Sequence, residues 1–490
     1  MSSLYTTDQV RRIDHSAMEH LGIAGYELMQ RAAAAAFATL RRRWPEARHI
    51  ALLAGSGNNG GDAFLLGVLA LRAGLTVDAI VLAHDSSGDA LRARLAFVAA
   101  SGRVVDAGGI TAIGDAAVVV DGLFGTGLSR PVQGAAAALI ERVNASGRPV
   151  LALDVPSGLN ADTGALFDVA IHADATISFV AWKRGLFTAD GLDCCGTREL
   201  ATLDLGDAPD AAVEADAHLL DASLASLLGP RRNNANKSTF GHVLAIGGDT
   251  GTAGAIHLTS EAALRCGAGL VSIATRQQNI SALNAARAEL MAHAVDCANQ
   301  LTPLIGRASV MAVGPGMGQG AWGRSLFDCV LACGKPLVID ADALNLLARN
   351  PHALPPAVVI TPHPGEAARL LGCDVATIQR DRFAAARELA SRYAAVTVLK
   401  GAGSLIAAPD GRVAVCPWGN SGMASGGMGD VLTGVIAALL AQGLSTWDAA
   451  RLGVALHARA GDIAAGDSPR GLLASDLFVP LRHLVNGFTR

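Results

Sequence analysis

Short apolar segments alternate with longer, Ala- and Leu-rich segments along most of this 490-residue chain. In the first half the apolar segments, rich in β-branched residues, occupy residues 49–54, 77–83, 116–124, 149–158 and 175–180. In the second half they occupy residues 242–249, 269–275, 308–316, 336–344, 357–366 and 396–403. Strands separated by segments of helix length form βαβ units, whose strands lie parallel in a sheet covered by helices. The alternation therefore predicts an α/β protein.

The alternation is interrupted in the acidic, Ala-rich stretch DLGDAPDAAVEADAHLLDAS at residues 204–223. A single hydrophobic core rarely grows beyond about 250–300 residues, so a chain of this length needs more than one domain. We place the junction in this stretch and expect two consecutive α/β domains, residues 1–215 and 216–490. The first is expected to be a Rossmann-like three-layer sandwich.

Composition narrows the class of protein. The formal net charge is −4 and Lys and Arg form no dense cluster, so nothing favours binding to nucleic acid. The polar start MSSLYTTDQVRRIDHSAMEH does not resemble a signal peptide, and no apolar window is long enough to span a membrane. The eight cysteines lack zinc-site spacing and are expected to be reduced core thiols. We expect a cytoplasmic homo-oligomeric enzyme with small-molecule substrates, and neither nucleic acid nor membrane as a partner.

A glycine-rich segment, GSGNNGGDAF, follows the first expected strand. Residues 55–60 match the G-x-G-x-x-G pattern of dinucleotide-binding loops. That fingerprint also needs an acidic residue at the end of the second strand, yet Asp78 precedes this strand and Asp85 follows it late. Amide and carboxylate oxygens suit a hard cation. A plain dinucleotide loop does not need the three polar residues found here, Asn58, Asn59 and Asp62.

Two further strand ends in the first half are polar. Asp121 lies in VVVDGLFGTGLSRP, and Asp154 and Ser157 lie in LALDVPSGLN. Because ligands gather at the carboxyl ends of parallel strands, these residues and the NNGGD segment are expected to meet at one pocket. Each Asp could alternatively be a helix cap or a turn former.

These motifs resemble the NAD(P)H-hydrate epimerase family. The likeness rests on NNGGD (58–62), DGLFGTGLSRPVQG (121–134) and DVPSGLNADTG (154–164), and it extends over residues 1–205. It implies that a hydrated nicotinamide nucleotide is bound by Asn58, Asn59, Gly60, Gly61, Asp62, Gly125, Thr126, Gly127, Leu128, Ser129, Arg130, Pro131 and Asp154. It also implies a potassium ion bound by Asn59, Asp121 and Ser157. The chain departs from the family at Ala63, where Gly is usual.

The reaction implied by this resemblance interconverts the R and S forms of the hydrate. A bond at the carbon that carries the hydroxyl must break and form again, which a positioned carboxylate can assist by proton transfer. Asp154 is the candidate. Lys183, in AWKRGLF, is either a substrate or phosphate contact or an exposed residue without a role.

In the second half, SGGMGDVLTGVIAAL (425–439) places glycines and Asp430 directly before an apolar helix. Free backbone N–H groups at a helix start bind anions. A carboxylate beside them suits phosphoryl transfer to a hydroxyl, because it can take the alcohol proton. Asp430 could alternatively cap the helix.

Three other strand ends carry polar or basic residues. KGAGS (400–404) offers a lysine and small residues for a nucleotide phosphate, and it is not a Walker A loop. His363 is held between two prolines in TPHPGE (361–366). Asp340 and Asp342 lie in VIDADALN (338–345) and are possible magnesium ligands.

The second half resembles the ADP-dependent NAD(P)H-hydrate dehydratase branch of the ribokinase-like superfamily. Six motifs appear in the family's order over residues 225–490: AIGGDTGTAGAIHLTSEAALRCGAGLV, VGPGMG, VIDADALN, TPHPGE, KGAGS and SGGMGD. The resemblance implies that the adenine nucleotide binds to Lys400, Gly401, Ala402, Gly403, Ser404 and Gly429. It implies that the hydrate binds to Ala255, Gly318, His363 and Asp430, with Asp430 as the base.

The implied reaction transfers phosphate from ADP to the hydrate, which then expels it to give NAD(P)H, AMP and phosphate, with Mg²⁺ as the expected counterion. If this step accepts one epimer, a fused epimerase supplies the other. Two alternatives stay open: a sugar or vitamin kinase fused to a dehydrogenase, and a non-catalytic binding module in the first half.

Overall fold

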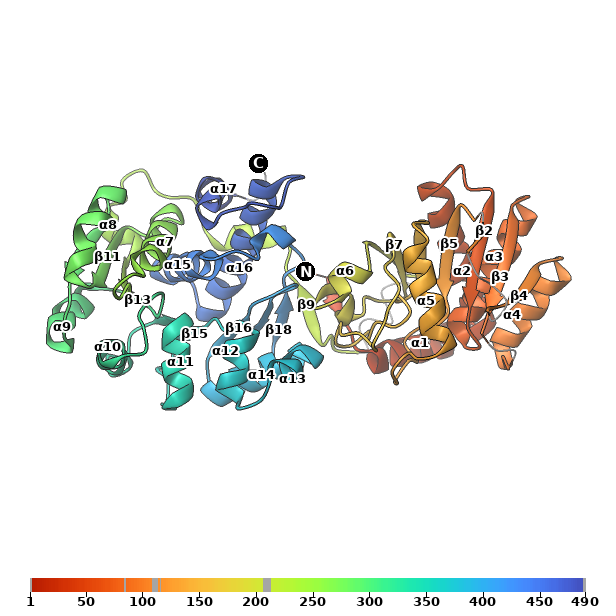
Figure 1. Ribbon diagram of the computed structural model, residues 1–490, viewed down its shortest axis with the longest axis horizontal. Coiled ribbons are helices and arrows are strands. Elements are labelled where there is room, and N and C mark those ends of the chain that lie inside the picture. The colour runs from red at the N-terminus through yellow and green to blue at the C-terminus, as the bar shows by residue number, and fades with distance from the viewer. Residues whose placement is uncertain (1, 83–84, 108–112, 115, 206–212, 488–490) are drawn as a thin grey trace. The chain divides into compact units, whose positions relative to one another are not determined.

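The computed structural model describes residues 2–82, 85–107, 113–114, 116–205 and 213–487. The chain divides into two compact units, one spanning Ser3–Ala217 and the other comprising Ser2 and the described residues from His218 onward. Each unit has its own sheet and its own helices (Figure 1). Residues 206–212, within the stretch where we expect the domain junction, lie outside the described residues, as does residue 83 of the expected strand 77–83.

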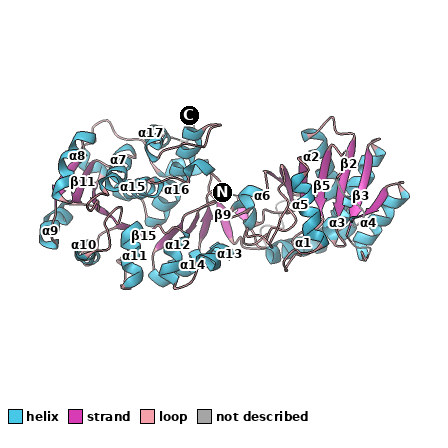
Figure 2. Ribbon diagram, in the orientation of Figure 1, coloured by secondary structure: helices cyan, strands magenta, loops and turns pink. Residues whose placement is uncertain are grey.

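The described residues of the first unit contain a seven-stranded sheet in which every pair of neighbours is parallel (Figure 2). Across the sheet its strands are β4 (Arg103–Asp106), β3 (Thr76–Val81), β2 (His49–Ala54), β5 (Val118–Gly122), β6 (Val150–Leu153), β7 (Ala175–Phe179) and β8 (Thr197–Ala201). The strand order reverses between β2 and β5. In open α/β sheets, the carboxyl ends of the strands at this point are where ligands bind.

Helices cover both faces of this sheet. They are α1 (Thr7–Leu21), α2 (Gly25–Arg43), α3 (Asn58–Arg72), α4 (Gly88–Ala99), α5 (Ala135–Ala145) and α6 (Gly191–Cys194). Along β2, Leu52 belongs to a core that α2, α3 and α4 share, whereas Leu53 belongs to a core that α5 shares. Successive residues point to opposite faces of a strand, so both faces are buried. The predicted three-layer sandwich is confirmed.

The second unit has a larger sheet. Across it run β9 (Ala217–Leu219), β18 (Val413–Val415), β17 (Leu405–Ala407), β16 (Val396–Leu399), β15 (Val358–Ile360), β14 (Leu337–Ile339), β13 (Val310–Val313), β10 (His242–Ile246), β11 (Leu270–Thr275) and β12 (Met291–Ala294). Neighbours from β12 to β16 are parallel, which confirms the βαβ prediction. The order reverses at β10, so the loops after β10 and β13 lie at the point where ligands are expected.

Strand–helix alternation does not predict the hairpin of β17 and β18. β17 pairs antiparallel with both β16 and β18, which makes this sheet mixed. Each of the two strands has three residues, too few to show a hydrophobic period. A two-residue strand, β1 (Ser3–Leu4), precedes α1 in the chain.

The helices of the second unit are α7 (Ala253–Arg265), α8 (Ile280–Ala286), α9 (Ala298–Arg307), α10 (Ala321–Leu331), α11 (Ala341–Arg349), α12 (Pro364–Leu371), α13 (Val375–Arg380), α14 (Arg382–Tyr393), α15 (Met428–Ala441), α16 (Thr446–Ala465) and α17 (Phe478–Leu484). Helix α15 is buried at every residue from Val431 to Leu440. It lies so close to α7 that a Cβ at Gly434 would be 1.9 Å from the carbonyl oxygen of Thr259. Only glycine therefore fits at this position without displacing a helix.

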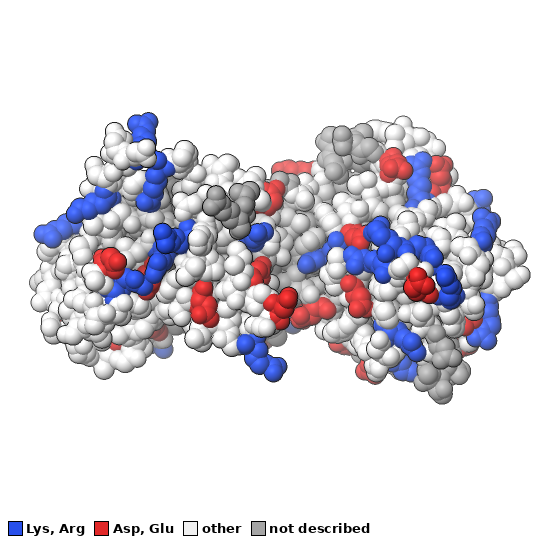
Figure 3. Space-filling view, turned by 90° about the horizontal axis from the view of Figure 1, so that it is seen from above, with Lys and Arg blue, Asp and Glu red and all other residues white. Residues whose placement is uncertain are grey.

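The described helices include none that is both long and apolar enough to cross a membrane. Acidic and basic side chains both lie on the face shown in Figure 3. All eight cysteines are free thiols, but Cys297 and Cys373 are exposed, so the expectation of core thiols is wrong for these two.

Candidate active sites

In the first unit, a cavity of about 740 Å³ opens at the carboxyl ends of β2, β5 and β6. The NNGGD segment is the first turn of α3 rather than a loop, with Gly57 as the residue before the helix. A Cβ at Gly60 would lie 2.0 Å from the carbonyl oxygen of Gly55, so glycine is required for this tight turn. Of the expected substrate-binding residues, Gly61 and Pro131 do not line the cavity, and those that do are Asn58, Asn59, Gly60, Asp62, Gly125, Thr126, Gly127, Leu128, Ser129, Arg130 and Asp154.

The three expected potassium ligands, Asn59, Asp121 and Ser157, lie together. Asp121 is fully buried and accepts hydrogen bonds from the backbone N–H of Ser157 at 2.7 Å and its hydroxyl at 2.6 Å. Asn59 donates through Nδ2 to the carbonyl oxygen of Phe124 at 2.8 Å. Its buried Oδ1 has no hydrogen-bond partner among the described residues.

This donor set fits a hard monovalent cation. It combines a carboxylate, a hydroxyl, a carbonyl and an amide oxygen without a donor, all of which are oxygen ligands. Burial raises the pKa of Asp121 to about 6, although the hydrogen bonds from Ser157 act to lower it. A cation beside this carboxylate would favour its ionised form.

Asp154 follows β6 and has a positive φ of 63°, which is unusual for a residue with a side chain. Its Oδ1 is paired with Nζ of Lys183. Lys183 is 1 % exposed and also donates to the carbonyl oxygen of Phe179 at 2.7 Å. The alternative that Lys183 is merely exposed is therefore wrong.

A further carboxyl group lies in this cavity, that of Asp14 on α1, which was not among the expected site residues. Asp14 lines the cavity, and its buried Oδ1 has no hydrogen-bond partner among the described residues. Burial raises the pKa of Asp14 to about 6, with Lys183 opposing and Asp154 reinforcing the change. Burial also raises the pKa of Asp62 well above its usual range. No strand end or motif marks Asp14, because it comes from the amino-terminal helix.

In the second unit, Asp430 stands in the first turn of α15, just after Gly427, whose φ is 90°. Burial raises the pKa of Asp430 to about 7, Asp340 adds to this effect and Lys400 opposes it. A carboxyl group with such a pKa can take up and release a proton at neutral pH, as a general base must.

Lys400 connects the neighbouring strand ends. Its Nζ donates to Oδ1 of Asp340 at 2.7 Å and lies 3.8 Å from Oε2 of Glu366. The other oxygen of Asp340 accepts from the hydroxyl of Thr433 at 2.8 Å. A Cβ at Gly429 would lie 3.1 Å from Nζ of Lys400, so the glycine leaves room for this lysine. Burial opposes the charge of Lys400, but Asp340 and Glu366 outweigh it and its pKa is raised.

The KGAGS segment bends tightly at Gly401, whose φ is 138°. The buried guanidinium of Arg382 lies against Gly401 and donates to the carbonyl oxygens of Leu399 and Lys400, both at 3.3 Å. The hydroxyl of Ser404 donates to the carbonyl oxygen of Gly401 at 3.0 Å. Ala402 and Gly403 complete the turn between β16 and β17.

His363 caps the start of α12. Its Nδ1 accepts from the backbone N–H groups of Gly365 at 2.9 Å and Glu366 at 3.3 Å. Burial and the nearby Lys400 lower the pKa of His363. Because Nδ1 accepts two hydrogen bonds, the ring proton is on Nε2, which lies 3.4 Å from Oε1 of Glu366. Glu366 is buried, which raises its pKa to about 7, and it was missed as a site residue although it ends the TPHPGE motif.

The two least distinctive expected residues lie near the point where the strand order reverses. Gly318, with a φ of 68°, donates its N–H to Oδ2 of Asp342 at 2.8 Å. Ala255 is in the first turn of α7. The hydroxyl of Thr252, the residue before this helix, donates to the carbonyl oxygen of Gly316 at 2.7 Å. Among the described residues, no three His, Cys, Asp or Glu side chains are grouped to hold a metal ion.

Two family profiles match separate parts of the chain. The profile of the YjeF-related protein N-terminus matches residues 25–185, and that of NAD(P)H-hydrate dehydratase matches residues 243–482. The chain is 44 % identical to the bifunctional NAD(P)H-hydrate repair enzyme of Coxiella burnetii, covering 99 % of this chain and 100 % of that protein.

Two solved structures resemble the second unit. A ribokinase-like superfamily protein from Enterococcus faecalis is 30 % identical, with a TM-score of 0.51 over 55 % of this chain and 95 % of that one. The ADP/ATP-dependent NAD(P)H-hydrate dehydratase of Bacillus subtilis, crystallised with ATP and Mg²⁺, is 29 % identical, with a TM-score of 0.50 over 55 % and 97 %. The predicted ribokinase-like fold is thereby confirmed. With an epimerase-type unit followed by a dehydratase-type unit, the chain belongs to the family of bifunctional NAD(P)H-hydrate repair enzymes.

Proposed function

We propose that residues 1–215 interconvert the R and S hydrates of NADH and NADPH. Residues 216–490 dehydrate the S hydrate with ADP, giving NAD(P)H, AMP and phosphate. The observation that carries this proposal is the carboxyl group of Asp430, whose pKa is about 7, at a glycine-rich helix start beside Lys400. Family membership supports both halves.

In the dehydratase half, Asp430 takes the proton of the ring hydroxyl, whose oxygen attacks the terminal phosphorus of ADP, and AMP leaves. The phosphorylated hydrate then loses phosphate from the same carbon and a proton from its neighbour, which restores the double bond. The adenine nucleotide is assigned to Lys400, Gly401, Ala402, Gly403, Ser404 and Gly429. The hydrate is assigned to Ala255, Gly318, His363 and Asp430. The Nε2–H of His363, which lies 3.4 Å from Oε1 of Glu366, is assigned as a donor to it.

Magnesium fits this half together with a nucleotide. Asp340 already accepts hydrogen bonds from Lys400 and Thr433, and Asp342 accepts them from the N–H of Gly318 and from Gln319. Protein-bound Mg²⁺ commonly keeps waters and shares one or two carboxylates with substrate phosphates. We therefore assign it to the phosphates of ADP, where it would neutralise the charge of the transferring group.

In the epimerase half, the substrate is assigned to the residues that line its cavity, together with Gly61 and Pro131. Potassium is assigned to Asn59, Asp121 and Ser157, and the unpartnered Oδ1 of Asn59 supports this assignment. The ion would hold together two turns that carry substrate contacts.

Asp14 and Asp154 provide two carboxyl groups of different character for epimerisation. Asp154 is ion-paired with Lys183, whereas Asp14 is protonated over a range that reaches about pH 6. We assign Asp14 as the acid that protonates the departing hydroxyl, so that water leaves and the ring nitrogen shares its lone pair with the carbon. Water then adds to the opposite face and gives its proton to Asp154.

One assay tests both halves. The full chain is incubated with mixed R and S hydrates of NADH, ADP, Mg²⁺ and K⁺, and the absorbance of the restored dihydronicotinamide is followed. Complete recovery is expected, whereas Asp430→Asn should abolish it and Asp154→Asn should leave a plateau at the share of S hydrate. Full recovery with Asp430→Asn would contradict the proposal.

The two alternatives predict other outcomes. A kinase fused to a dehydrogenase would accumulate a stable phosphorylated product and reduce or oxidise a nicotinamide cofactor. A non-catalytic first half would give the plateau in the unmodified chain. The expected homo-oligomer stays a prediction, which sedimentation of the full chain would test.

A further inference from the structure

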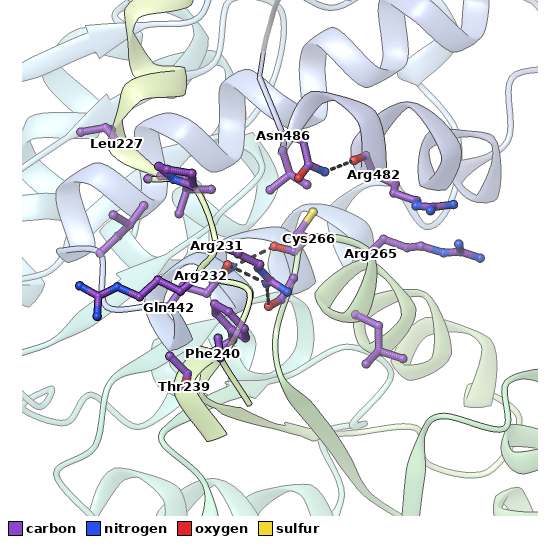
Figure 4. A pocket seen from close by; sticks show the side chains of 18 of the residues that line it. Leu227, Arg231, Arg232, Thr239, Phe240, Arg265, Cys266, Gln442, Arg482 and Asn486 are labelled. Atoms are coloured by element: carbon purple, nitrogen blue, oxygen red, sulfur yellow. Dashed lines mark hydrogen bonds between the residues drawn. The ribbon is translucent and has the colours of Figure 1, made fainter. Parts of the chain in front are cut away.

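The second unit contains another cavity, of about 1040 Å³, which none of the expected site residues line (Figure 4). Cys266 and Gln442, in its wall, come directly after the carboxyl ends of α7 and α15. Ala255 and Asp430 lie at the amino ends of the same helices. A helix of this length spans about 20 Å, so the cavity lies at the other edge of the sheet from the candidate dehydratase site.

Positive charge dominates the wall of this cavity. The five arginines that line it are Arg231, Arg232, Arg265, Arg287 and Arg482. Two glutamates, Glu261 and Glu289, also line it, so the wall has an excess of three positive charges, although the formal net charge of the chain is −4. Figure 4 shows Arg265 and Arg482 extending in the same direction from two different helices. Such a concentration of guanidinium groups in one concave site is suited to phosphate.

The position of Arg231 is built into the fold. Its Nη2 donates to the carbonyl oxygen of Gly267 and, at 3.1 Å, to Oε1 of Gln442. Its guanidinium carbon lies 3.6 Å from the centre of the Phe240 ring. Gly267 has a φ of 98°, and a Cβ there would lie 2.4 Å from Nη2, so the glycine makes room for the arginine. A guanidinium held in this way loses little entropy when it binds an anion.

A second group of charges surrounds Glu261, which is 4 % exposed. Its Oε1 accepts from Arg265 at 2.9 Å and also from Arg287, and its Oε2 lies 3.3 Å from Nε2 of His257. One buried carboxylate thus orients two guanidinium groups and leaves them with an excess positive charge. The buried Nε of Arg287 has no acceptor among the described residues.

Part of the remaining wall is polar, with Asn234, Thr239, Gln442 and Asn486, and part is apolar, as a ligand with a ring requires. Leu264, Leu444 and Val485 line the cavity together with Phe240. Ligand sites commonly combine such apolar walls with a few fixed polar groups, in volumes of about 300–1,000 Å³. An inorganic anion would use only the arginines, whereas a nucleoside phosphate would use both kinds of surface.

We propose that this cavity is a second ligand site, which binds a nucleoside phosphate away from the reacting centre. The phosphate contacts the guanidinium groups of Arg231, Arg265 and Arg482, and the nucleoside contacts Phe240 and its apolar neighbours. The site is distinct from the proposed dehydratase site, and the two are separable by substitution.

The test measures binding of ADP to the full chain by equilibrium dialysis, with pyrophosphate as a second probe. Arg482→Gln is the variant, because this exposed residue in the last turn of α17 has no role in the described core. Arg349→Gln is the matched control, since it removes an equal charge from an exposed position in the last turn of α11. Arg231→Gln is the second variant, and its melting temperature shows whether it folds.

We expect Arg482→Gln and Arg231→Gln each to weaken one class of ADP site about tenfold, as loss of a charge-assisted hydrogen bond implies, and Arg349→Gln to change nothing. ADP should bind this site more tightly than pyrophosphate. Unchanged binding in folded Arg482→Gln and Arg231→Gln would overturn the site. Equal affinity for ADP and pyrophosphate would overturn the assignment of a nucleoside. Arg231 and Arg482 lie outside the proposed dehydratase site, so their variants test this cavity whether or not ADP also binds near Asp430.

Discussion

Replacing Lys400 with Met should move the acidic limb of the dehydratase pH profile to higher pH. Asp430 must be ionised to act as a base, so turnover rises as pH rises through its pKa of about 7. The charge of Lys400 lowers this pKa against the effects of burial and of Asp340. Without that charge, the carboxyl group holds its proton to a higher pH.

The size of the effect follows from the ionised fraction. An opposite charge close by changes a carboxyl pKa by about 1 to 3. If the pKa of Asp430 rises by about one, its ionised fraction at pH 7 falls from about one half to about one tenth, and turnover falls about fivefold. If the pKa rises by about two, the loss is about fiftyfold. At pH 9 the turnover of the variant should reach most of the unmodified value in the first case and about half of it in the second.

The assay is recovery of NADH from its S hydrate at saturating ADP, followed by absorbance from pH 5.5 to about 9.5. Saturation separates the pKa effect from weaker nucleotide binding, because Lys400 is also an assigned nucleotide contact. Lys237→Met, which removes an exposed lysine from the same unit, is the control and should leave the profile unchanged. Removing Lys400 also leaves the buried Asp340 without its cation, which costs about 3–5 kcal/mol, so folding is checked by thermal denaturation. An acidic limb that stays near pH 7, or moves lower, would refute the reasoning.

Three further outcomes are expected. Asp14→Asn should slow exchange between the R and S hydrates about 10²–10⁴-fold, measured by NMR, and leave dehydration of the S hydrate unchanged; equal loss of both activities would instead point to a folding defect. Ser157→Ala removes the hydroxyl that donates to Asp121, and it should raise the K⁺ concentration needed for epimerisation about tenfold. If the variant needs no more K⁺ than the unmodified chain, the assigned potassium ligands are wrong. Gly434→Ala would place a methyl group 1.9 Å from the carbonyl oxygen of Thr259 and should lower the free energy of unfolding by about 3 kcal/mol or more, measured by urea denaturation; a neutral result would mean that α15 can shift freely.

The sequence predicted the parallel sheets because buried strands are continuous apolar runs that end in polar residues. The same rule located Asp121, Asp154, Asp340 and Lys400, since in a parallel sheet each strand end is also a point where ligands gather. The details at these points were less predictable. The expected loop containing Asn58 is the first turn of a helix, because the glycines that suit a loop also permit the close approach of α3 to Gly55.

Residues that reach a site from elsewhere in the chain were not predicted. Asp14 enters its cavity from the amino-terminal helix α1, which carries none of the expected motifs, so only the folded chain relates it to Lys183. The buried Lys183 donates to the carbonyl oxygen of Phe179 at the end of β7, a contact that no side-chain pattern reveals. Asp340 was expected as a possible magnesium ligand, but its oxygens accept from Lys400 and Thr433, partners that lie 60 and 93 positions away in the chain.

The burial of α15 has a consequence for how this protein can change. Asp430, the proposed base, lies in the first turn of a helix whose next ten residues are all buried. A change in packing at any of these ten residues would displace the first turn of α15. Substitutions at these residues are therefore expected to affect turnover as well as folding. Attempts to engineer the protein should therefore leave the residues from Val431 to Leu440 unchanged.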